Sequence, residues 1–184
     1  DNTMVVRVAP LTAENAIEVN SDGSFVLHEA VIDATLMGVA QRQVSLLVSL
    51  TPPPGIAIRA WEELVTVLLK RYAMQSRYRI LRWELAATPE QARLLYPAFV
   101  KSLQREIPGA LAGYRFVSAN PLVGLDKFME SCIENALPVH ILGWRVTESA
   151  EELGQTLLLL RHRLSQSPWF RTTRLLPEIG RAHV

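Results

Sequence analysis

The residues best suited to bind another macromolecule lie in one basic and aromatic stretch, between positions 70 and 83. The stretch has no acidic residue and contains Lys70, Arg71, Tyr72, Arg77, Tyr78, Arg79, Arg82 and Trp83. Guanidinium groups neutralise phosphates and aromatic rings stack on bases, so single-stranded nucleic acid or an acidic protein could bind here. On a strand, however, Arg79 and Arg82 point to opposite faces, and Arg82 could pair with Glu84. We predict Arg71, Arg79 and Arg82 as partner-binding residues, with an ordinary solvated surface as the alternative.

The C-terminal segment, residues 165–184, supplies the other predicted partner-binding residues, which are Trp169, Phe170, Arg171 and Arg174. Exposing a large apolar side chain forfeits about 1.5–3 kcal/mol. The segment is therefore expected either to pack on its own domain or to dock on a partner, with a frayed terminus as the remaining alternative. Because Pro168 and Pro177 oppose a helix, we predict an irregular, extended path.

Residues that could carry catalysis are sparse. Cys132 and His140 could meet as nucleophile and base, and His28, Glu29 and Asp33 could form an acid–base or metal cluster. Both Cys132 and His140 lie in apolar segments, which favours a buried, unreactive thiol and a hydrogen-bonded core histidine. The sequence has no Gly-x-Ser-x-Gly, no closely spaced Cys/His set and no glycine-rich phosphate loop. We therefore predict no catalytic residues, no cofactor and no metal site.

Composition places the chain among ordinary globular proteins. Of its 184 residues, 49% are hydrophobic and 20% are charged, and the formal net charge is +1. These values exclude a disordered chain and a collagen-like chain, and the single cysteine excludes a disulfide scaffold. No apolar run reaches the about 20 residues of a membrane span. The charge is uneven: residues 1–50 carry net −4 and residues 161–184 carry net +4.

These features favour a cytoplasmic protein. The chain begins at Asp1 and not at methionine, so an upstream signal or anchor, and a longer parent protein, stay open. Sixteen arginines against three lysines suggest a bacterial genome rich in GC.

Hydrophobic patterning predicts strands and helices that alternate along the middle of the chain. A first strand at 4–9 is followed by a hairpin whose arms, 16–19 and 24–27, flank the turn residues Asn20–Gly23. The segment 29–39 fits either a strand or a short helix. Further strands are expected at 44–50, 78–86, 114–118 and 139–144. The strand at 78–86 alternates, with Ile80, Arg82 and Glu84 on one wet face.

Four helices are expected between and after these strands, at 57–73, from 88 to about 108, 121–135 and 147–164. Thr88 and Gln91 have capping-box spacing, and Pro97 should kink or shorten the helix that they begin. Asn120 is expected to cap the third helix, and Thr147 or Ser149 the last. Gly154 lies inside the last helix, where we expect it to allow a close approach of a neighbouring element.

The sequence thus predicts an α/β fold (or α+β), a mixed, largely parallel sheet of five to seven strands covered by four main helices, with an N-terminal hairpin. Two split βαβ halves are the alternative. We expect a single domain, 1–184, with a hairpin region 1–43, a core 44–164 and a tail 165–184. The favoured function is a non-catalytic protein–protein interaction domain, an adaptor or scaffold of a larger bacterial assembly. A nucleic-acid-binding domain using 70–83, and an enzyme of unrecognised type, are the alternatives.

Overall fold

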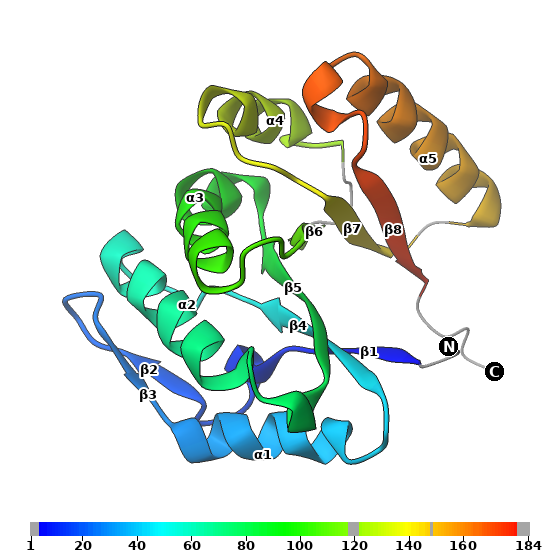
Figure 1. The fold of residues 1–184 in the computed structure, drawn as a ribbon. Coiled ribbons are helices and arrows are strands. Elements are labelled where there is room, and N and C mark those ends of the chain that lie inside the picture. Colours follow the sequence, from blue (N-terminus) through cyan, green and yellow to red (C-terminus); the bar gives the residue numbers. More distant parts are fainter. Residues whose placement is uncertain (1–3, 118–121, 148, 180–184) are drawn as a thin grey trace.

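The computed structural model describes residues 4–117, 122–147 and 149–179, and a parallel sheet lies at its centre (Figure 1). Its six strands, in spatial order, are β1 (Val5–Val8), β4 (Ser45–Leu50), β5 (Ile80–Ala87), β6 (Ala112–Phe116), β7 (Ile141–Val146) and β8 (Arg174–Ile179). Every neighbouring pair in this sheet is parallel. The predicted fold class is confirmed. The alternative of two split βαβ halves is wrong, because the strands follow one another in chain order.

Helices cover one face of this sheet. The described residues form α1 (Glu29–Ala40), α2 (Ile58–Tyr72), α3 (Pro89–Glu106), α4 (Leu125–Glu134) and α5 (Ala150–Ser165). Each crossover leads to the next strand in the same direction, and crossovers share one hand, so the helices fall on one side and form an arc around the strands (Figure 1). The sequence predicted four main helices and left 29–39 open. The fifth helix is α1, which buries Ile32, Leu36 and Ala40 at a spacing of four residues.

The predicted N-terminal hairpin is present as β2 (Ile17–Val19) and β3 (Phe25–Leu27), which pair antiparallel. It forms a small sheet of its own and does not extend the main sheet. At its turn Gly23 adopts a φ of +84°, and a Cβ there would lie 2.8 Å from the Cβ of Ala57. The carbonyl of Gly23 accepts a hydrogen bond from the Ala57 amide at 3.1 Å. The hairpin is therefore held against the loop that precedes α2, and only glycine fits this contact.

The apolar core fills the space between the sheet and the helices. Alternate residues of β4, namely Leu46, Val48 and Leu50, belong to the core together with Trp61 and Leu64 of α2. The same alternation holds along the other strands, where Leu85, Tyr114 and Trp144 are core residues. The residues between these positions lie on the opposite face of the sheet, which we call the inner face.

Residues 168–170 and 174–179 form regular elements, so the expectation of an irregular path is wrong for these residues, while the expected extended conformation is present as a strand. A short 3₁₀ helix, η3 (Pro168–Phe170), leads into β8, which pairs with β7 from Ile141↔Arg174 to Val146↔Ile179. Two hydrogen bonds anchor the start of β8: Thr173 Oγ1 donates to the Val139 carbonyl at 2.6 Å, and the Arg174 amide donates to the His140 carbonyl at 2.9 Å. Pro177 opposes a helix but is compatible with an edge strand such as β8. The last residues, 180–184, lie outside the described part.

Helix boundaries test the capping predictions. The capping boxes Thr88–Gln91 and Ser149–Glu152 are confirmed. The helix α3 continues past Pro97 to Glu106, so the expected shortening is wrong. The carbonyl that Pro97 leaves without a helical donor belongs to Arg93, an exposed residue, and water can bind it there. The cap predicted at Asn120 lies outside the described residues.

Two further short 3₁₀ helices are present: η1 (Pro10–Thr12) follows β1, and η2 (Ser76–Tyr78) precedes β5. Among the described residues, no helix combines the length and the apolar character needed to cross a membrane.

Candidate functional site

The inner face of the sheet carries a concentration of charged side chains. Strand alternation places five arginines and two glutamates there, which gives this face a net charge of +3: Arg7, Arg82, Arg115, Arg145, Arg174, Glu84 and Glu178. Most lie in the carboxyl-terminal halves of their strands; Arg82 and Arg174 lie toward the amino-terminal ends. Ligand sites in parallel sheets gather at the carboxyl ends of the strands, so this end of the inner face is the candidate site.

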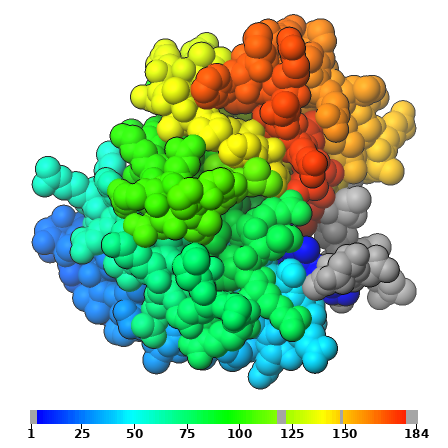
Figure 2. Space-filling view, in the orientation of Figure 1, coloured from blue at the N-terminus to red at the C-terminus, as the bar shows by residue number. Residues whose placement is uncertain are grey.

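The sheet curls far enough for its two edge strands to meet through side chains. Arg7 Nη1 of β1 lies 3.1 Å from Glu178 Oε2 of β8. Figure 2 shows the blue of β1 and the red of β8 on the same side of the molecule. The curl encloses part of the inner face, and the Glu84 residue is only 4% exposed.

Arg7 and Arg115 hold the two glutamates in an alternating network. Arg7 donates from Nε to Glu84 Oε2 at 2.9 Å and from Nη2 to Glu84 Oε1 at 3.4 Å, a two-pronged pair. Glu178 forms an ion pair with Arg7 and accepts a hydrogen bond from Arg115 Nη2. A buried carboxylate needs such partners, because removing one leaves an uncompensated charge that costs about 3–5 kcal/mol. The network therefore fixes β1, β5, β6 and β8 relative to one another.

Two buried polar atoms beside this network have no hydrogen-bond partner within the described part of the chain. They are Ser49 Oγ and Arg115 Nε. Ser49 is 1% exposed and lies opposite Glu84 in the register of β4 and β5. A buried polar group without a partner costs about 1–3 kcal/mol, and native proteins keep few of them. These atoms are the groups of the inner face that a polar molecule would satisfy.

Small residues surround the two atoms. Gly113 is the register neighbour of Glu84 on β6, and Gly143 is the register neighbour of Arg115 on β7. A Cβ at Gly113 would lie 3.1 Å from Glu84 Cβ, and a Cβ at Gly143 would lie 3.1 Å from the Leu176 carbonyl oxygen. Gly113 therefore allows the close approach of Glu84, whereas at Gly143 the Leu176 carbonyl oxygen is the one heavy atom, apart from the chain neighbours, within 4 Å of the position that a Cβ would take.

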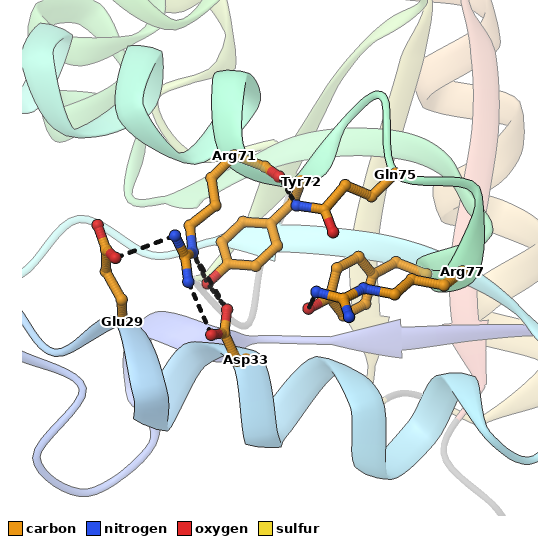
Figure 3. A network of polar contacts seen from close by, with 7 residues as sticks. Glu29, Asp33, Arg71, Tyr72, Gln75 and Arg77 are labelled. Atoms are coloured by element: carbon orange, nitrogen blue, oxygen red, sulfur yellow. Dashed lines mark hydrogen bonds and ion pairs between the residues drawn. The ribbon is translucent and has the colours of Figure 1, made fainter.

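Of the residues predicted from the basic stretch, Arg71 is committed to an intramolecular contact (Figure 3). Arg71 donates from Nε to Asp33 Oδ1 at 3.2 Å and from Nη2 to Asp33 Oδ2 at 2.8 Å. Its Nη1 also forms an ion pair with Glu29 Oε2 at 3.0 Å. The Tyr72 hydroxyl also donates to Asp33, at 2.5 Å. The bonds from Arg71 lower the pKa of Asp33 below its ordinary value. Arg71 thus ties α1 to α2.

The aromatic rings of the basic stretch point into the protein. Tyr72, Tyr78 and Trp83 are buried, and Arg77 lies over the Tyr78 ring with its guanidinium carbon 4.8 Å from the ring centre. Bases stack on exposed rings, so the stretch offers nucleic acid no stacking surface. Arg79 is exposed, with a φ of +50° after η2, and Arg82 lies on the inner face. The structure therefore separates Arg71, Arg79 and Arg82, and the expected Arg82–Glu84 pair gives way to Arg7–Glu84.

The four residues predicted from the C-terminal segment differ in exposure and do not form one surface. Phe170 is 2% exposed and belongs to the core. Trp169 is 43% exposed, and its Nε1 donates to the Leu137 carbonyl at 2.9 Å. Arg171 and Arg174 are exposed, and Arg174 starts β8 on the inner face.

Among the described residues, no hydrogen bond joins Cys132 to His140. Cys132 is buried, as predicted, and burial raises the pKa of its thiol to about 12. The ring Nδ1 of His140 accepts a hydrogen bond from the Ala112 amide at 2.8 Å, and burial lowers the pKa of this ring. Among the described residues, no group of three His, Cys, Asp or Glu side chains could hold a metal ion.

A separate hollow of about 710 Å³ lies between α3 and α4. Its charged lining residues, Glu90, Arg93, Asp126 and Lys127, are exposed. Water satisfies exposed groups, so nothing in this hollow requires a ligand in the way that Ser49 and Arg115 do.

Comparison with known proteins gives no further evidence on this site. No protein-family model matches the chain, and no curated protein matches it significantly. The candidate site therefore depends on its own residues.

The sequence patterns did not single out the inner-face residues Arg7, Ser49, Arg115 and Glu178. The available signal was polar side chains at alternate positions inside otherwise apolar strands, as in Ser45-Leu-Leu-Val-Ser49-Leu. Such positions must face either water or a polar interior.

Proposed function

We propose that the protein binds a small polar molecule on the inner face, at the carboxyl ends of the strands. The observation that carries the proposal is the pair of buried, unpartnered atoms, Ser49 Oγ and Arg115 Nε, beside the ion pairs of Glu84 and Glu178. Each would gain a hydrogen bond from a ligand, and the carboxylates offer further acceptor positions.

The burial of these atoms favours a small molecule over a macromolecule. Ser49 is 1% exposed, and the ion pair from Arg7 to Glu178 joins the strands at the two edges of the sheet. A protein surface or a nucleic-acid duplex is too large to reach a hydroxyl enclosed in this way. The proposed ligand is therefore a molecule of a few heavy atoms.

The test uses the purified chain, a panel of small polar molecules, and thermal unfolding as the readout, because a ligand that binds the native state raises the melting temperature. Ser49→Ala removes the unpartnered hydroxyl. We expect the unliganded variant to be as stable as the parent or more stable, and to lose the ligand-induced shift. Ser45→Ala is the matched control, since Ser45 lies on the same strand and face at the other end. Ligand shifts that Ser49→Ala and Ser45→Ala reduce equally, or no shift with any molecule, would contradict the proposal.

A protein–protein interaction is the second candidate function, favoured by exposed leucines on α5. Leu158 is 73% exposed and Leu159 is also exposed, and the exposed Arg161 follows Leu158 by three residues on the same helix. Two exposed leucines beside an arginine fit an acidic protein segment that carries a leucine-like anchor.

Fluorescence titration of the purified chain with a synthetic peptide of alternating Glu and Leu tests this second candidate, with a Lys and Leu peptide as the comparison. Leu158→Glu should abolish binding of the acidic peptide, and Met74→Glu, at another exposed apolar residue, should not. Equal binding of both peptides, or no binding, overturns this candidate.

A further inference from the structure

We infer that the ligand of the inner face carries a carboxylate or phosphate group, and that Arg145 and Arg115 bind this group. The inference rests on the proposed function and names the chemistry of its ligand. It follows from the charge balance, from the state of each arginine and from the space between the two.

The charge balance at the carboxyl end favours an anion. Arg7, Arg115 and Arg145 face Glu84 and Glu178 there, which leaves a net charge of +1, and the arginines toward the amino-terminal ends raise the charge of the whole face to +3. The Nε of Arg115 is buried, so its attraction for an anion is less weakened by water than that of the exposed Arg145.

Arg145 is the guanidinium available to a ligand that enters from solvent. It lies opposite Glu178 in the register of β7 and β8, yet Glu178 is bound by Arg7 and Arg115. Within the described residues, the guanidinium of Arg145 has neither an ion pair nor a hydrogen bond, and the side chain is exposed at the end of β7. Its five N–H donors match the paired oxygens of a carboxylate or phosphate.

Arg115 supplies a second donor deeper on the same face. Its Nη2 is bound to Glu178, but its Nε is buried and without a partner in the described part of the chain. A neutral acceptor would satisfy this N–H, and an anionic oxygen would do so with about twice the strength.

The backbone leaves space between the two arginines. Gly143 is the register neighbour of Arg115 and precedes Arg145 by two residues, so all three share the inner face. Apart from the Leu176 carbonyl oxygen, no heavy atom beyond its chain neighbours lies within 4 Å of the position that a Gly143 Cβ would take. An anionic group placed over Gly143 would therefore have Arg115 beside it on β6 and Arg145 two residues further along β7.

The experiment measures binding of inorganic phosphate and of malonate to the purified chain by isothermal titration, with glycerol as an uncharged probe. We expect both anions to bind, with affinity that falls as salt is added. Arg145→Gln should weaken binding by about tenfold or more, as expected for the loss of a charged hydrogen-bonding partner. Arg174→Gln is the matched control, an exposed arginine on the same face at the opposite end, and should change the affinity by less than about twofold.

The outcomes separate this inference from the proposed function. Binding of uncharged molecules that depends on Ser49, without binding of either anion, overturns the inference and leaves the proposed function standing. Equal losses in Arg145→Gln and Arg174→Gln also overturn it, because they indicate attraction by the general charge and no defined site. If no small polar molecule binds, the proposed function fails and the inference fails with it.

Discussion

Arg7 holds carboxylates from two strands that are distant in the chain. Its partner Glu84 lies 77 residues away, and its other partner, Glu178, belongs to the strand at the opposite edge of the sheet. Alternation in the sequence correctly placed Arg82 and Glu84 on one face. A β-bulge between Leu46 and Leu47 in the pairing with β5 places Ile80 with the core residues, so the wet face was only partly predicted. Curvature then buries Glu84, which no local pattern encodes.

Replacing Arg7 by methionine should lower the free energy of unfolding by about 3 kcal/mol, because Glu84 stays buried without its partner. Urea unfolding measures this value. Replacing both Arg7 and Glu84 by methionine should recover part of the loss, since an apolar pair leaves no uncompensated charge at that position. A double variant less stable than Arg7→Met alone would show that the unpaired carboxylate of Glu84 is not the cause of the loss and would contradict this account.

At the scale of single elements, local chemistry predicted what local bonds determine. The capping boxes at Thr88 and Ser149 and the turn at Asn20–Gly23 were predicted because side chains there bond backbone within a few residues. The helix α1 and the strand β8 were left open or missed. Both depend on distant partners, with α1 packed on the sheet and β8 held by Thr173 against Val139.

The contact between α1 and α2 should make stability depend on pH. Hydrogen bonds from Arg71 lower the pKa of Asp33 below 3.8, so the native state favours the carboxylate more than the unfolded state does. That stabilisation is complete above the unfolded pKa and is lost as pH falls through the folded pKa. Asp33→Asn should therefore cost up to about 1 kcal/mol at neutral pH, a modest value because the pair is partly exposed, and less at about pH 3. Urea unfolding of the parent and of Asp33→Asn at the two pH values measures the difference in their free energies of unfolding. A difference that is larger at about pH 3 than at neutral pH would contradict the role given to the Asp33 carboxylate.

Gly154 in α5 should be replaceable with a gain in stability. We expected a close neighbour, but no heavy atom beyond its own helix turn and chain neighbours lies within 4 Å of its Cβ position, and the residue is exposed. Glycine inside a helix is less favourable than alanine by about 0.5–1 kcal/mol, so Gly154→Ala should raise the free energy of unfolding by that amount. Gly23→Ala is the opposite case, because its positive φ and the nearby Ala57 Cβ should make the change destabilising. Thermal unfolding of both variants measures these changes. A lower melting temperature for Gly154→Ala than for the parent would contradict the open surroundings described for Gly154.

At the scale of the whole molecule, the largely parallel pairing was predictable, and the order of the strands and the site were not. Alternating strands and helices indicate a parallel sheet, but several strand orders are compatible with this alternation, and the sequence did not decide between them. Which inner-face residues meet depends on the tilt and curl of six strands, because contacts such as Arg115 to Glu178 skip the strand between them. The sequence showed polar residues such as Ser49 and Glu84 within strands, but it did not show that they share one enclosed face.

Removal of residues 165–184 tests how far the whole fold depends on its last strand. The sequence left self-packing, docking and fraying open for this segment. In the structure Phe170 and Leu175 belong to the core, β8 completes the pairing of β7, and Glu178 joins the two edges of the sheet. Loss of the two apolar side chains alone forfeits about 1.5–3 kcal/mol each.

A chain that ends at Leu164 should therefore lose cooperative unfolding, which circular dichroism during heating measures. In the full chain, Phe170→Ala should lower the free energy of unfolding by about 3–5 kcal/mol. Trp169→Ala, at the half-exposed neighbour, should cost less. A truncated chain that unfolds as cooperatively and at the same temperature as the parent would mean that β8 is dispensable and that the Arg7–Glu178 pair does not hold the curled sheet together.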